Sequence, residues 1–169
     1  MSERKLPFMD HLTELQHRLT RVVIAIMVGT ILAFVFRDPI VLVLMDPTEN
    51  FSPIAEGKPI FTEMTEMVGI TMKISLVSGI ILALPIVIFE LVMFINPGLT
   101  SRERRGLFFL LPATLVAFGA GAAFGYFIIF PPALHFLTTF GTELATPMIR
   151  IGNYLNLIVT LLFWMGIIF

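Results

Sequence analysis

Between two long apolar segments, the chain reads Phe94-Ile95-Asn96-Pro97-Gly98-Leu99-Thr100-Ser101-Arg102-Glu103-Arg104-Arg105. This short polar turn places three arginines around one glutamate. Because charged side chains are costly inside a bilayer, such a turn fixes how the chain crosses a membrane and where a charged ligand can dock. The flanking apolar segments, about 67–95 and 106–130, are each long enough to span a bilayer as a helix.

The composition indicates a membrane protein. Of the 169 residues, 57% are hydrophobic and only 14% are charged, and the mean hydropathy is +0.93. Soluble domains are about half apolar and about a quarter charged. No Lys, Arg, Asp or Glu lies between Arg105 and Glu143, and none follows Arg150. We therefore predict an all-α, polytopic membrane protein with a single transmembrane domain over residues 1–169.

Four membrane spans are predicted, at about 19–36, 67–95, 106–130 and 151–169. Residues 19–36 cover roughly 27 Å as a helix, just enough for a hydrocarbon core of about 30 Å. Pro85 is expected to kink the second span and Pro131-Pro132 to end the third, because proline lacks the amide hydrogen that a helix interior uses. The last span is still apolar at Phe169, so the domain is expected to be incomplete at its C-terminus.

The residues before the first span have one apolar face. This face consists of Phe8, Leu12, Leu15, Leu19 and Val22, at helical spacing. The opposite face is polar, so residues 6–18 are predicted to form an amphipathic helix at the membrane surface that runs directly into the first span.

Two exposed loops are expected, over residues 37–66 and 133–150. In the first, the apolar run Ile40–Met45 is expected to form a short surface helix before Pro47, and Glu66 lies at the end of the loop. The second loop is expected to begin as a helix.

Basic residues near the spans predict the orientation. If the N-terminus is inside, seven basic residues lie on the inner side: Arg4, Lys5, Arg18, Arg21, Arg102, Arg104 and Arg105. Three lie on the outer side: Arg37, Lys58 and Arg150. Since cytoplasmic loops carry the excess of lysine and arginine, the N-terminus is predicted to be cytoplasmic.

No motif for enzymatic chemistry is visible in the sequence. There is no Walker-type loop, GxSxG or HExxH. Cysteine is absent, and the three histidines lack metal-ligand spacing. Gly121 and Gly125 lie in an apolar span among small residues and are interpreted as helix packing in preference to partner docking. We therefore expect no enzyme activity, cofactor, metal or nucleic-acid partner.

Two charges, Lys73 and Glu90, fall within the second span. Intramembrane charges suggest function by default, which leaves open the alternative of a fragment of a small-solute or ion secondary transporter. The favoured interpretation of Lys73 is an anchor that snorkels to the outer interface. Glu90, about one turn from the inner loop, is expected to reach the headgroups or a partner.

Four segments, in order along the chain, resemble one family. His11-Leu12-Thr13-Glu14-Leu15-Gln16-His17-Arg18-Leu19 is similar to an HLxELRxRL motif, and Pro47 matches a proline of the first outer loop. The stretch from Phe94 to Arg105 resembles FxxPxLxxxERR, and Gly125-Tyr126-Phe127…Phe130-Pro131 resembles the end of a third helix. The chain thus resembles the TatC family, the polytopic receptor subunits of the twin-arginine protein translocase.

The resemblance implies a six-helix, glove-shaped protein in the prokaryotic cytoplasmic (inner) membrane. It implies a cytoplasmic face that binds twin-arginine signal peptides of folded cargo through Glu14, Phe94 and Glu103. A supporting cytoplasmic patch would comprise Arg18, Pro97, Leu99, Arg104 and Arg105. The family acts in multimeric complexes with small single-span TatA-like and TatB-like subunits, driven by the proton-motive force.

This chain departs from the family pattern in two places. Gln16 stands where the motif usually has arginine. The family's glutamate in the fourth helix is expected just after Phe169, with two further helices beyond it, so the 169-residue chain is not expected to translocate cargo alone.

Two of the proposed site carboxylates have simpler structural interpretations. Thr100 and Glu103 form a capping-box pattern that satisfies free amides at the start of a helix, and the sequence alone favours this role. Carboxylates also bind guanidinium groups through paired, charge-assisted hydrogen bonds, and the resemblance favours this second role; the two are compatible. Glu14 is similarly placed to pair with Arg18 one helical turn away.

Overall fold

The computed structural model describes residues 6–49, 63–95, 101–140 and 150–169, and they fold into helices. The helices are α1 (Leu6–Val35), α2 (Arg37–Glu49), α3 (Met64–Ile95), α4 (Ser101–Phe124), the π-helical turn η2 (Gly125–Ile129), α5 (Phe130–Thr139) and α6 (Ile151–Ile168). Within these ranges, four stretches are long and apolar enough to cross a membrane: Leu12–Val35, Thr65–Phe94, Leu111–Leu137 and Ile151–Ile168. The predicted all-α architecture with four spans is confirmed.

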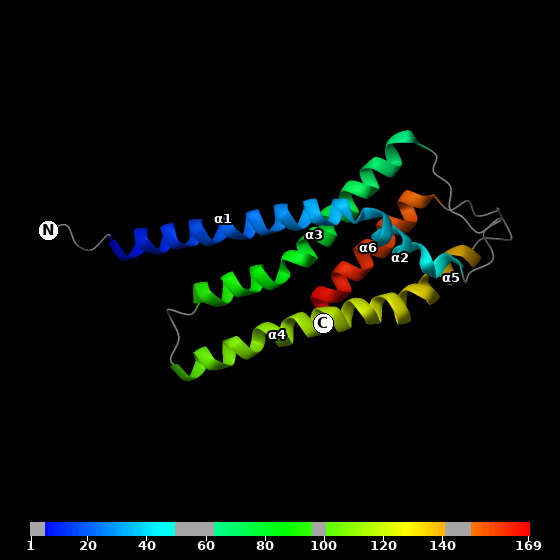
Figure 1. Cartoon of the computed structure of the whole chain (residues 1–169). Coiled ribbons are helices and arrows are strands. Elements are labelled where there is room, and N and C mark those ends of the chain that lie inside the picture. Colours follow the sequence, from blue (N-terminus) through cyan, green and yellow to red (C-terminus); the bar gives the residue numbers. More distant parts are fainter. Residues whose placement is uncertain (1–5, 50–62, 96–100, 141–149) are drawn as a thin grey trace.

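The helices form an elongated bundle with two distinct ends (Figure 1). The start of α1, the end of α3 and the start of α4 lie together at one end, which we call the Glu14 end. The starts of α3 and α6 lie toward the opposite end with α2 and α5, and we call this the Arg150 end. The predicted amphipathic helix and the first span are one continuous helix, α1.

Helical structure continues past both proline sites at which the sequence predicted an end, Pro47 and Pro131-Pro132. The prediction that the third span ends at Pro131-Pro132 is wrong. In the wide turn η2 the hydrogen-bond pattern shifts by one residue, so that the Phe130 N–H donates to the Gly125 carbonyl. Both prolines then lie at the start of α5, where a missing amide hydrogen is tolerated. The short helix expected before Pro47 likewise runs past it, to Glu49.

Two pairs of helices cross closely at glycines. A Cβ atom added to Gly79 of α3 would lie 2.5 Å from Cα of Thr30 in α1, and one added to Gly29 would lie 2.6 Å from the Gly79 carbonyl oxygen. In the second pair, a Cβ atom on Gly121 of α4 would lie 2.5 Å from the Met165 carbonyl oxygen of α6. The interpretation of the Gly121 and Gly125 face as internal packing is confirmed.

The buried core lies toward the Arg150 end. Side chains from α3, α5 and α6, among them Ile74, Phe130 and Leu155, are fully buried there. The Tyr154 hydroxyl donates to the Leu44 carbonyl at 2.8 Å, which ties α6 to α2. Large apolar side chains elsewhere on the spans are exposed, as expected of surfaces that face lipid.

The close crossing of α1 and α3 gives a direct test. We expect Gly79→Ala to lower the apparent Tm of the purified protein in detergent, because the added Cβ overlaps the α1 backbone and overpacking costs about 1–3 kcal/mol. Gly69→Ala, in the same helix, is the matched control, since nothing lies within 4 Å of its Cβ position. Equal Tm values for the two variants would contradict the crossing.

Candidate functional site

Four charged side chains form a cluster near the Glu14 end of the bundle. Arg18 in α1 donates from Nε and Nη2 to Oε1 of Glu14, at 3.0 and 2.6 Å. Its third nitrogen, Nη1, donates to Oε2 of Glu90 in α3, at 2.9 Å. Arg21 completes the cluster through Nη1, which donates to Oε1 of Glu90 at 3.1 Å. One guanidinium therefore bridges two carboxylates.

The two carboxylates differ sharply in exposure. The Glu90 side chain is 7% exposed, whereas that of Glu14 is 37% exposed. A buried carboxylate is costly unless it is paired and hydrogen-bonded, and Glu90 satisfies this condition with two guanidinium partners. Of these two carboxylates, Glu14 is the one accessible to a ligand that approaches from outside the bundle.

Helix geometry explains why these residues meet. Glu14 and Arg18 are four residues apart on α1, and Arg18 and Arg21 are three apart, so all three lie on neighbouring positions of one helix. Arg18 precedes Gly29 by eleven residues, and Glu90 follows Gly79 by eleven residues. Because α1 and α3 run in opposite directions and cross at these glycines, equal distances along each helix bring Arg18 and Glu90 together.

The other predicted cytoplasmic residues lie at the same end, as far as they are described. Phe94 lies on α3, one turn beyond Glu90, and is partly buried. Glu103, Arg104 and Arg105 lie in the first turns of α4, but their side chains are outside the described part of the structure. Pro97 and Leu99 also lie outside the described residues.

The outer-loop residues lie toward the Arg150 end. Oε1 of Glu66 accepts the Gly152 N–H at 2.9 Å, in the first turn of α6, and Glu66 Oε2 lies 3.9 Å from Nη2 of Arg150. Arg150 also donates to Glu63, at 3.0 Å. Pro47 lies within α2, and its side chain is outside the described set.

The expectation that Glu90 reaches the headgroups is wrong, because Glu90 is buried against Arg18 and Arg21. Lys73 is exposed, as expected of a snorkelling side chain, but its Nζ also donates to Asn156 Oδ1 and lies 3.4 Å from the Thr160 hydroxyl, both on α6. These partners of Lys73 and the part played by Arg21 in the cluster were not predicted from the sequence. For Arg21, the spacing from Arg18 was an available signal.

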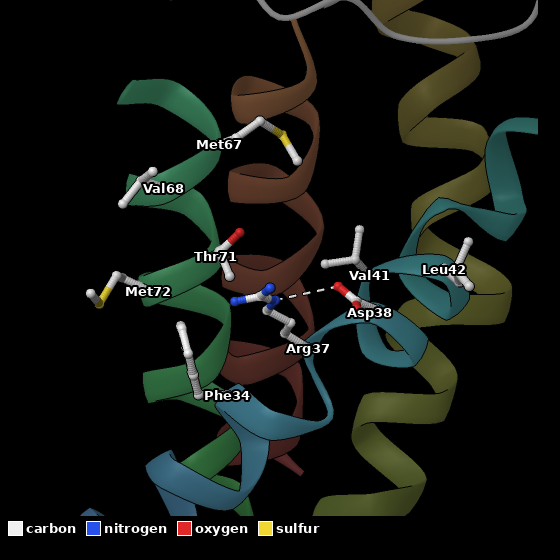
Figure 2. Close-up of a pocket in the computed structure, with 9 residues that line it drawn as sticks. All are labelled: Phe34, Arg37, Asp38, Val41, Leu42, Met67, Val68, Thr71 and Met72. Atoms are coloured by element: carbon white, nitrogen blue, oxygen red, sulfur yellow. Dashed lines mark hydrogen bonds and ion pairs between the residues drawn. The ribbon is translucent and has the colours of Figure 1, made fainter. Parts of the chain in front are cut away.

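A groove lies between α1, α2 and α3 and is lined by none of the cluster residues (Figure 2). It has a volume of about 650 Å³ and mostly apolar walls. Arg37 projects into it, bonded through Nε to Asp38 at 3.4 Å and placed 5.0 Å from the centre of the Phe34 ring. Among the described residues, no group of His, Asp and Glu is arranged to hold a metal ion.

The long apolar helices define a multi-pass membrane protein, and the charged cluster gives one end of it a carboxylate accessible to cations. The family model described as "Sec-independent protein translocase protein (TatC)" matches residues 10–169. The chain belongs to the TatC family.

Individual relatives agree with this assignment. The chain is 36% identical to a Sec-independent protein translocase protein TatC from Desulforapulum autotrophicum, over 99% of this chain and 62% of that protein. It is 32% identical to the protein of the same name from Carboxydothermus hydrogenoformans, over 100% of this chain and 68% of that protein. The chain thus spans about two thirds of the length of these relatives.

A solved structure agrees as well. A crystal structure of the twin-arginine translocase receptor TatC matches with a TM-score of 0.81 at 36% identity, over 93% of this chain and 69% of the other. At 36% identity, the two chains are similar in sequence as well as in fold.

The contact between Glu66 and α6 leads to a second prediction. Glu66→Ala removes the acceptor of a first-turn amide, so we expect faster hydrogen exchange at the start of α6, equivalent to about 1 kcal/mol of local stability. Glu63→Ala is the control, because the Glu63 side chain is 67% exposed and exposed ion pairs contribute about 0–1 kcal/mol. Unchanged exchange at Gly152 in Glu66→Ala would contradict this role.

Proposed function

We propose that this chain carries the signal-peptide-binding core of a twin-arginine translocase in the cytoplasmic (inner) membrane of a prokaryote. Its cytoplasmic face binds the paired arginines of signal peptides on folded cargo. Export of that cargo then uses the proton-motive force and TatA-like and TatB-like single-span partners within a multimeric complex. Membership of the TatC family and the likeness to a structure described as a twin-arginine translocase receptor support this proposal.

The observation that carries the proposal is that Glu14 already binds a guanidinium. Two nitrogens of Arg18 donate to its Oε1, and within the described part of the chain its Oε2 has no hydrogen-bond partner. A carboxylate that is partly exposed and pre-arranged for such a pair suits an incoming arginine, because charge-assisted pairs are the strong class of hydrogen bond.

Glu103 and Phe94 supply the remainder of the binding face. The start of α4 and the end of α3 lie at the Glu14 end, so Glu103 belongs to the same region as Glu14. Pro97, Leu99, Arg104 and Arg105 make up the supporting patch, whereas Arg18, predicted for the same patch, is the internal partner of Glu14. The seven basic residues on this side, against three on the other, favour a cytoplasmic location for it.

Nothing in the arrangement of Lys73 and Glu90 favours a small-solute pathway. These residues are seventeen positions apart on α3, or about 25 Å along a helix. Each is engaged by a different helix, Lys73 by α6 and Glu90 by α1. In this proposal, the chain is a component of a protein translocase and has no enzymatic role.

The first test is photocrosslinking of a twin-arginine signal peptide to the receptor in native membrane vesicles. We expect Glu14→Gln and Glu103→Gln each to reduce crosslinking about tenfold or more, since a hydrogen bond to a charged group contributes about 1.5–3 kcal/mol. Glu63→Gln, at the other end of the bundle, is the matched carboxylate control, and a twin-lysine peptide controls for charge. Crosslinking at the wild-type level in Glu103→Gln, with normal membrane insertion, would leave Glu103 as a helix cap only.

The orientation can be tested separately, because these 169 residues contain no cysteine. We expect Ser101→Cys to react with a membrane-impermeant maleimide only after the cytoplasmic side is opened. Ser52→Cys, between α2 and α3 along the chain, is expected to react from the outside. The reverse pattern would put the arginine-rich turn beyond the reach of cytoplasmic signal peptides and would refute the proposed function.

A further inference from the structure

We propose that Glu90 is a positioning residue that makes Glu14 available to signal peptides. The guanidinium of Arg18 occupies Glu14 as an internal stand-in for the incoming arginine, and Glu90 holds Arg18 when that arginine displaces it. This inference rests on the proposed function and adds a part of the site that neither the family motifs nor the sequence pattern assign. Glu90 contacts no signal peptide in this scheme. It acts through Arg18.

The bridging geometry shows how the stand-in is held. Arg18 uses Nε and Nη2 on Glu14 and keeps Nη1 on Oε2 of Glu90. Its guanidinium is therefore shared between an accessible carboxylate and a buried one. A bidentate pair with an arriving arginine uses both oxygens of Glu14. One of them, Oε1, already accepts from Arg18, so a bidentate pair requires at least partial displacement of Arg18.

Glu90 lowers the free energy needed for this exchange. A carboxylate has about four acceptor positions, so Glu90 can take a second hydrogen bond from Arg18 while it retains Arg21. The displaced guanidinium thus remains paired at every stage, and no unpaired charge is left at the helix surface. Because the Glu90 side chain is only 7% exposed, an arriving arginine is directed to Glu14.

The charge balance leads to the same conclusion. Two carboxylates and two guanidinium groups make the cluster neutral. Without the Glu90 charge, the cluster would carry a net charge of +1 and Arg18 would have Glu14 as its only partner in it. Both changes oppose the arrival of two further positive charges.

The test measures binding of a synthetic twin-arginine signal peptide to the full receptor in native membrane vesicles. We expect Glu90→Gln to weaken binding about tenfold, equivalent to about 1.4 kcal/mol, and Glu90→Asp to restore most of the loss. In an Arg18→Gln background, the same Glu90→Gln change is expected to weaken binding less than about twofold, because the competitor is gone. Glu63→Gln is the matched control and is expected to bind as wild type.

A second variant keeps the test decisive if Glu90→Gln does not accumulate in the membrane. We expect Arg18→Gln alone to bind the peptide at least as tightly as wild type, because Glu14 no longer shares its oxygen. Arg37→Gln removes an arginine at the opposite end of the bundle and serves as the control. Binding about tenfold weaker in Arg18→Gln would overturn the inference, since Arg18 would then support the peptide and not compete with it.

The outcomes separate this inference from the proposed function. If Glu14→Gln abolishes binding while Glu90→Gln binds as wild type, or loses the same factor with and without Arg18, the receptor function stands and the role of Glu90 is refuted. If wild type binds twin-arginine and twin-lysine peptides equally and Glu14→Gln changes nothing, the receptor function fails, and this inference fails with it.

Discussion

The antiparallel crossing of α1 and α3 at Gly29 and Gly79 is the constraint on which the charged cluster depends. At this point a single added Cβ atom would meet the opposing backbone, so the two helix axes are as close as side chains permit. The cluster lies eleven residues away on each helix, roughly 16 Å along the axis. A wider crossing would move α3 away from α1 and leave Glu90 buried in an apolar setting without its two guanidinium partners.

That burial has an energetic consequence for the whole of α1. Removing one partner of a buried ion pair leaves an uncompensated charge, which typically costs about 3–5 kcal/mol. The pairing of Arg18 and Arg21 with Glu90 therefore fixes both the register of α1 against α3 and the rotation of α1 about its axis. Glu14, one turn before Arg18, is oriented as a result, although it makes no hydrogen bond to α3 within the described part of the chain. The accessible carboxylate is placed by the buried one.

The sequence predicted the spans well, because hydrocarbon length and the absence of charge leave few alternatives. It also predicted Gly121 and Gly125 as a packing face. It failed at Pro131-Pro132. There a π-helical turn of the preceding residues places both prolines at the start of α5, where their missing amide hydrogens are tolerated, and no local sequence pattern predicts such a turn. It also failed at Glu90, because the partner of a lone intramembrane charge depends on which helices are neighbours and in which register. Periodicity shows which face of a helix a residue occupies, but it does not show which other helix that face meets.

Polar contacts toward both ends of α3 select its neighbouring helices and their register, which apolar packing alone does not do. In a bilayer, lipid tails are as apolar as leucine, so burying an apolar helix face does little to choose one neighbour or one register over another. α3 compensates with charged groups along its length: Glu66 and Lys73 bind α6 toward the Arg150 end, and Glu90 binds α1 toward the Glu14 end. α4 has no charged residue after Arg105 and is fitted to α6 through glycines instead. The accessible carboxylate of Glu14 therefore lies where α3 is held by charge, because charge pairing fixes side-chain positions that shape alone leaves variable.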